Sequence, residues 1–301
     1  MEFTMKHLKN LVLFVLLASA QFAYSDEACD ACDPCYMGTE CDLCNISLCD
    51  MEFELYADAL YWHNDLSLIT GEGKTDHDYN WGWRIGASAY WNSWDIGLRY
   101  TSFSSTAKRN VLFGESSFVA ASEFDYDVFD VELGRACCIC EGILFRPFFG
   151  GKFARIKVDR NIDQFTPDRK LKLDGCGLYV GFDNRWQICS FNVCDRSIPV
   201  ALVSRFSTGV LDADFKYSVN LEGSELSAKD CQFVPVHELY AGLEFRMCGL
   251  CNADAFVQVG YEVQCWGWRE EVVRALAIAS FGDSFAHLGV GGLVLRLGAN
   301  F

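Results

Sequence analysis

The feature that most constrains this chain is an alternation of apolar and polar side chains that recurs about ten times between residue 51 and residue 301. A period of two residues is typical of β-strands, whereas a helix would repeat every 3.6 residues. The pattern is clearest at 285–301, where Arg296 is the lone charge between apolar residues at alternate positions, namely Leu293, Leu295, Leu297, Ala299 and Phe301. We therefore expect a last strand that ends on the aromatic Phe301 and closes the fold.

This alternation predicts an all-β fold, an antiparallel transmembrane β-barrel of about 10 strands. In such a barrel one face of each strand meets lipid and the other faces the lumen, so a lone charge such as Arg296 must point inward. The number rises to twelve if residues 104–125 or 207–235 contain a further hairpin. The ten segments with this period are 51–62, 81–91, 94–103, 126–135, 143–153, 176–188, 198–206, 236–247, 255–265 and 285–301.

The connections between these segments alternate in length. Short ones fall at 92–93, 136–142, 189–197 and 248–253, and long ones at 63–80, 104–125, 154–175, 207–235 and 266–284. Outer-membrane barrels show this asymmetry, with short periplasmic turns and long extracellular loops, whereas a soluble β-sandwich has no reason for it. The loop at 266–284 is too apolar for a free external loop, so we expect it to pack in or over the mouth or to extend the flanking strands.

Aromatic residues stand near the ends of the predicted strands. Amphipathic rings prefer the depth of the lipid headgroups, which predicts that these residues form interfacial girdles. The alternative is that they are ordinary sheet residues, since aromatic side chains are enriched in any sheet. The candidates are Tyr61, Trp62, Trp81, Trp91, Trp94, Trp186, Tyr261 and Trp266.

The N-terminal segment predicts export. Lys6 and Lys9 precede the apolar run 11–17, and the small residues 18–20 follow it. This is the order of a secretory signal peptide, and cleavage after Ala20 or after Ser25 fits it. The sequence thus predicts a signal peptide at 1–25, a Cys-rich periplasmic arm at 26–50 and a barrel in the bacterial outer membrane at 51–301. Beyond the signal no apolar run is long enough for a membrane helix.

The 16 cysteines of an exported chain predict disulfide bonds, because the compartment beyond the inner membrane is oxidising. A zinc or iron–sulfur site in the arm is the alternative, since Cys-x2-Cys pairs can hold a metal. The loop lengths place Cys176, Cys231 and Cys265 on the outer side and the others on the periplasmic side, where they could link homo-oligomers or other Cys-rich envelope proteins. The disulfide candidates are Cys29, Cys32, Cys35, Cys41, Cys44, Cys49, Cys137, Cys138, Cys140, Cys189, Cys194, Cys248, Cys251, Cys231 and Cys265.

Charged residues at the inward positions are the candidate lumen lining. Their mixed signs and acidic excess suit a pore with a modest cation preference, yet the same residues could pair and plug a barrel this small. The candidates are Glu52, Glu54, Asp58, Arg84, Asp95, Arg99, Asp130, Glu132, Arg146, Arg185, Arg205, Glu238, Glu244, Arg246, Glu262 and Arg296.

No sequence motif predicts an enzyme or a cofactor, and apart from the Cys-x2-Cys pairs of the arm none predicts a metal site. Gly-x-Ser-x-Gly, His-Glu-x-x-His and phosphate-loop patterns are absent from the sequence. A net charge of −16 argues against a nucleic-acid partner. Three function classes remain. They are a porin for passive diffusion of small hydrophilic solutes and ions, a structural envelope protein linked by disulfides, and an adhesin-type barrel that presents long surface loops. Outer-membrane lipid is the expected partner of all three.

Several short motifs follow one another along the predicted barrel, at 78–86, 94–101, 126–134, 146–151, 175–186 and 260–264. The first two read Asp-Tyr-Asn-Trp-Gly-Trp-Arg-Ile-Gly and Trp-Asp-Ile-Gly-Leu-Arg-Tyr-Thr. By these motifs the chain resembles the Legionella-type major outer-membrane protein family, and porin-like proteins of environmental chlamydiae look similar. The resemblance covers most of residues 51–301 and implies an abundant outer-membrane β-barrel, often held by disulfides, that acts as a porin. The Cys-rich arm at 29–49 lies outside the resemblance.

Overall fold

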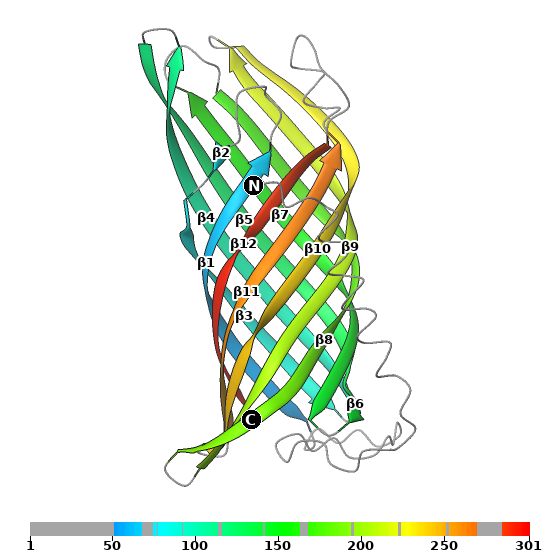
Figure 1. Cartoon of the computed structure of the whole chain (residues 1–301). Coiled ribbons are helices and arrows are strands. Elements are labelled where there is room, and N and C mark those ends of the chain that lie inside the picture. Colours follow the sequence, from blue (N-terminus) through cyan, green and yellow to red (C-terminus); the bar gives the residue numbers. More distant parts are fainter. Residues whose placement is uncertain are drawn as a thin grey trace.

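The computed structural model describes residues 51–67, 75–76, 78–91, 93–113, 116–140, 142–162, 168–193, 196–221, 224–250, 253–269 and 285–301. These residues form a closed antiparallel β-barrel with tilted strands (Figure 1). The predicted signal peptide, the Cys-rich arm and the apolar residues 270–284 lie outside the described residues. Within the described residues, no helix is long and apolar enough to cross a membrane.

Ten strands follow one another around the barrel in chain order, and the last pairs with the first, so the predicted fold class is confirmed. Two short strands lie beside this ring: β2 (Thr75–Asp76) pairs with β1, and β6 (Cys137–Cys140) pairs with β7. The ring consists of β1 (Glu52–Ser67), β3 (Asn80–Trp91), β4 (Trp94–Phe113), β5 (Ser116–Arg135), β7 (Ile143–Ile162), β8 (Asp168–Val193), β9 (Arg196–Leu221), β10 (Ser224–Leu250), β11 (Ala253–Arg269) and β12 (Phe285–Asn300).

The C-terminal strand closes the barrel, as the alternation at 285–301 predicts. Strand β12 pairs with β11 on one side and with β1 on the other. The terminal Phe301 continues this pairing, because its backbone N–H donates to the Phe53 carbonyl at 2.8 Å and its carbonyl accepts from the Phe53 N–H at 3.1 Å. The end at which β1 begins and β12 ends is the lower end in Figure 1, and the opposite end is called the upper end below.

An apolar belt surrounds the lower part of the barrel. Leu243 of β10 pairs in register with Leu202 of β9 and with Val259 of β11, and all three side chains are exposed on the outside. Directly paired residues of an antiparallel sheet project from the same face, so the belt continues from strand to strand. The alternation predicts that the apolar face of each strand points outward, which is confirmed here, and the belt is the surface that meets lipid.

The predicted long connections at 104–125, 154–175 and 207–235 are wrong. Their residues extend the flanking strands, and the three connections shrink to 114–115, 163–167 and 222–223. They add no further hairpin to the ring. Strand β10 has 27 residues, which corresponds to about 90 Å of extended chain, although 9–11 residues suffice for a membrane strand. Three hairpins therefore rise well beyond the apolar belt (Figure 1).

These extensions do not continue the predicted pattern, because their apolar residues stand at the inward positions and their polar residues at the outward ones. Along β5 the outward residues change from Phe129, Val131 and Leu133 below to Glu123 and Asp125 above, and the inward ones from Asp130 and Glu132 to Phe124, Tyr126 and Val128. Outward charges in lipid are strongly unfavourable, so the upper parts of the strands stand in water. Above the lipid the barrel has the ordinary arrangement of a water-soluble sheet, polar outside and apolar inside.

Two of the predicted girdle residues do not face lipid. Trp62 and Trp266 point inward and are completely buried in the upper core, so their assignment to an interface was wrong. Trp81, Trp186, Tyr61 and Tyr261 are exposed on the outer wall, and Trp91 and Trp94 are partly exposed. The rings of Tyr61 and Trp81 lie 5.0 Å apart and form part of such a girdle.

Some wall positions accept only glycine. A Cβ atom at Gly292 would lie 2.1 Å from the Tyr61 carbonyl oxygen, and one at Gly242 would lie 2.7 Å from the Val259 carbonyl oxygen. Both contacts are with backbone, which cannot move away without disturbing the strand pairing. No side chain therefore fits at Gly292 or at Gly242 without displacing the wall.

Candidate functional site: the barrel interior

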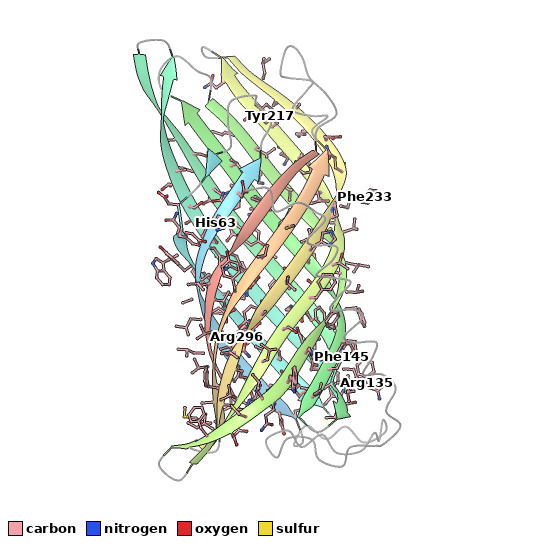
Figure 2. The ribbon with its side chains drawn as sticks, in the orientation of Figure 1. His63, Arg135, Phe145, Tyr217, Phe233 and Arg296 are labelled. Atoms are coloured by element: carbon pink, nitrogen blue, oxygen red, sulfur yellow. The ribbon has the colours of Figure 1, made fainter. Side chains whose placement is uncertain are left out.

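The inward charged residues predicted from the sequence gather in the lower half of the barrel. Arg296 marks this level in Figure 2, and Tyr217 marks the upper extension. Glu52 is exposed at the lower end, and five candidates are partly exposed, namely Glu54, Arg146, Arg185, Arg205 and Arg296. The remaining candidates are buried: Asp58, Arg84, Asp95, Arg99, Asp130, Glu132, Glu238, Glu244, Arg246 and Glu262.

Glu238 of β10 lies at the centre of the charged layer. It accepts hydrogen bonds from Arg99 at 3.1 Å, from Lys152 at 2.7 Å and from Ser207 at 3.1 Å. Asp130 is the second carboxylate of this cluster and lies 2.7 Å from both Arg99 and Lys152. Strands β4 and β10 are five places apart in the ring in either direction, so the contact between Arg99 and Glu238 crosses the full width of the lumen.

A second cluster surrounds Arg84 of β3. Its guanidinium donates to both carboxylate oxygens of Glu262 on β11, at 2.8 and 2.9 Å, and to Asp58 on β1 at 3.2 Å. Asp58 also accepts from Arg296 of β12 at 2.8 and 3.0 Å. Paired oxygens on a planar guanidinium give the most directional form of ion pair, so these side chains are held in one geometry.

A third cluster lies around Phe148 of β7. The guanidinium carbon atoms of Arg146 and Arg205 stand 5.2 and 4.1 Å from the centre of its ring. Arg146 pairs with Asp95 and Asp183, and Arg205 pairs with Asp183 and Glu132. Each cation therefore has carboxylates at its edge and an aromatic face above it, an arrangement suited to arginine.

Strand β10 contributes one more carboxylate below these clusters. Glu244 accepts from Arg185 at 2.8 Å, from Arg246 at 3.2 Å and from Gln258 at 2.7 Å. The alternation of β10 places Glu238 and Glu244 on the same inward face, six residues apart. The acids and bases of the lining are thus paired with one another at several levels of the barrel.

An apolar core fills the barrel above the charged layer. Tyr126 of β5 donates to Gln264 of β11 at 2.5 Å, and its ring centre lies 5.8 Å from that of Trp266. These strands are also five places apart in the ring, so here too side chains touch across the full width. The core residues include Leu60, Trp62, Phe103, Phe124, Val128, Ile156, Val158, Leu173, Leu211, Phe215, Val234, Val236, Leu288 and Val290.

Sequence analysis missed this core and two of the polar groups that complete the charged layer. Lys152 and Tyr179 lie within predicted strands but are not among the candidates, although both are buried in the interior and the Tyr179 hydroxyl donates to Glu132 at 2.8 Å. The signal for the core was present as alternating apolar residues at 154–158 and 211–215. This signal does not predict membrane strands, because its apolar residues stand at the inward positions and those of the lipid-facing segments at the outward ones.

The described cysteines lie at both ends of the wall. Cys138 is disulfide-bonded, whereas Cys137, Cys176, Cys189, Cys231 and Cys265 carry free thiols. Cys137 belongs to β6 and Cys189 to the lower part of β8, so both lie at the lower end of the barrel (Figure 1). Cys231 and Cys265 lie on neighbouring strands but do not bridge each other, since Cys265 pairs in register with His237, six residues from Cys231. The arm cysteines, Cys194 and Cys251 fall outside the described residues, as do the side chains of Cys140 and Cys248.

A closed ring of ten antiparallel strands with an apolar outer belt and a charged interior defines a transmembrane β-barrel of the outer-membrane type. The family model described as Legionella pneumophila major outer membrane protein precursor matches residues 49–297. The chain belongs to this family, and its location is the bacterial outer membrane.

Solved outer-membrane barrels share the fold at low sequence identity. The outer membrane protease OmpT from Escherichia coli is 9% identical with a TM-score of 0.54, over 85% of this chain and 98% of that one. A major outer membrane protein from Thermus thermophilus is 11% identical with a TM-score of 0.39, over 83% of this chain and 98% of that one. No curated protein sequence matches this chain. At such identities the likeness to OmpT shows the fold alone.

Proposed function

We propose that this protein is a structural, non-conducting barrel of the outer membrane. The observation that supports the proposal is that side chains from opposite walls touch across the lumen, Arg99 with Glu238 and Tyr126 with Gln264. A diffusion porin needs a continuous aqueous passage lined by hydrated charges. The lining charges described here are paired and mostly buried instead.

The porin function predicted from the sequence is the competing hypothesis, and conductance separates the two. Full-length protein refolded into planar lipid bilayers in potassium chloride is expected to give no stepwise conductance. Insertion is checked by the shift in gel mobility on heating, and a known diffusion porin in the same lipid is the positive control. Uniform conductance steps from the folded protein would overturn the proposal in favour of the porin.

The disulfide-linked role extends this proposal. We infer that cysteines at the lower end, together with the Cys-rich arm, join the barrel to other copies or to other Cys-rich envelope proteins. Supporting observations are the exposed thiols of Cys137 and Cys189 at that end and the oxidising compartment predicted there. An even number of strands, with the first strand beginning and the last strand ending at one end, is the arrangement that outer-membrane barrels adopt with that end in the periplasm.

We expect whole envelopes to contain cross-linked forms of the protein that collapse to one band with reductant. Free thiols are blocked at lysis, and the gel is run without reductant. Replacing the six arm cysteines, at 29, 32, 35, 41, 44 and 49, by serine should abolish the cross-linked bands. The matched control, Cys176→Ser with Cys231→Ser, should leave them unchanged, because these thiols lie on the outer wall of the upper half. A monomeric wild-type band without reductant would refute the linkage.

A further inference from the structure

Four lysines form a continuous row across the outer wall of the upper extension. Lys157 of β7 pairs in register with Lys172 of β8, Lys172 with Lys216 of β9, and Lys216 with Lys229 of β10. All four positions belong to the outward set of their strands, and none of the four side chains is buried. Because directly paired residues share a face and lie about 5 Å apart, the row brings four positive charges side by side.

The four positive charges of the row repel one another. Like charges directly opposite each other destabilise a sheet, and here the same sign is repeated over four strands. Lys172 pairs with Asp174 at 2.6 Å, but Lys157, Lys216 and Lys229 form no ion pair with any residue that the structure describes. Of the nearby outward carboxylates, Asp174 also pairs with Arg155 at 2.9 Å and Asp214 accepts from the Cys231 thiol at 2.9 Å. Asp125 of β5 lies directly opposite Lys157 and borders the row on that side.

The row lies on the strands that carry the upper margin of the apolar belt. Phe153 is four residues below Lys157 on β7, and Phe233 is four residues below Lys229 on β10, a distance of about 13 Å along each strand. Phe233 is 75% exposed and projects from the outer wall (Figure 2), and Leu178 on β8 is equally exposed. A ligand that matches this surface has anionic groups above and acyl chains below.

We propose that the lysine row binds the phosphate groups of an outer-leaflet glycolipid whose acyl chains lie against Phe153, Leu178 and Phe233. The row spans four strands, about 14 Å, which accommodates a disaccharide head group with a phosphate at each end. Clustered lysines attract anionic lipid head groups in proportion to their number. The site therefore anchors the wall of β7 to β10 to a specific lipid at the level where the strands leave the membrane.

Binding of bisphosphorylated lipid A to the purified full-length protein in detergent tests this proposal. The variant K216Q/K229Q removes two charges of the row and is expected to weaken binding about thirtyfold. K216R/K229R keeps the charge and should bind as the wild type does. The control S104E/T106E lowers the net charge by the same amount at exposed outward positions of β4, four strands from Lys216 and five from Lys229 in the ring, and should leave binding unchanged. Heat-dependent gel mobility verifies that every variant is folded.

Three results would overturn the proposal. Equal weakening by K216Q/K229Q and S104E/T106E would show a general charge effect without a site. Equal binding of dephosphorylated lipid A would show that the phosphates are not recognised. Tight binding of heparin that depends on Lys216 and Lys229, with no binding of lipid A, would assign the row to a soluble polysaccharide instead.

Discussion

Replacing Glu238 by alanine is expected to destabilise the barrel by about 3–5 kcal/mol, because it leaves buried cations without enough counter-charge. Arg99 and Lys152 share two carboxylates, Glu238 and Asp130, and all four side chains are at most 6% exposed. In E238A two cations compete for the single carboxylate of Asp130. Urea unfolding in lipid vesicles, followed by tryptophan fluorescence, measures the change.

Two further variants separate the charge effect from a general loss of packing. R155A removes the ion pair of Arg155 with Asp174. Because Arg155 is 59% exposed, this change should lower the free energy of unfolding by at most about 1 kcal/mol. The double variant K152M/E238L removes one charge of each sign and should recover much of the stability lost in E238A, since apolar replacement of a buried pair is often neutral. If E238A cost no more than R155A, the interior around Glu238 would be hydrated and the packed lumen would be wrong.

The second large effect concerns the lipid-facing wall. Leu243→Arg is expected to lower the free energy of unfolding by about 2–4 kcal/mol, because its side chain lies in the apolar belt beside Leu202 and Val259. The same unfolding experiment in vesicles measures it. Ser104→Arg is the matched control, since Ser104 is an outward residue of the β4 extension that stands in water, and its replacement should have little effect.

Gly242, the inward neighbour of Leu243, shows how the structure changes an expectation. Its inward position predicts that a charge there would only tune the lumen. A Cβ atom would in fact lie 2.6 Å from the Tyr240 hydroxyl and 2.9 Å from the Gly260 Cα atom, so even Gly242→Ala should destabilise the wall.

For the lipid-facing wall, equal stabilities of L243R and S104R would contradict the placement of the belt.

The sequence by itself determined the fold class and the direction of most side chains within the belt. The reason is that a strand has a period of two, and a slip of one residue would bring every lipid-facing side chain into the lumen. At 293–301 and 239–247 this constraint is strict, because lipid tolerates no charge on the outer face. The inward direction of Arg296, Glu238 and Glu244 follows from it.

Tertiary structure alone decided how far the strands extend and what the inward charges do. Above the belt water replaces lipid, so the apolar residues change from the outer to the inner face, as they do between Phe129 and Val128 on β5. A prediction that assumes lipid along the whole outer face therefore places the end of the strand at this point, too early. The contacts of Arg99 with Glu238 and of Tyr126 with Gln264 join residues more than a hundred positions apart, and only the closure of ten strands into a narrow ring brings them together. The alternation specifies which face a residue occupies, but the curvature of the closed barrel determines which residues meet across it.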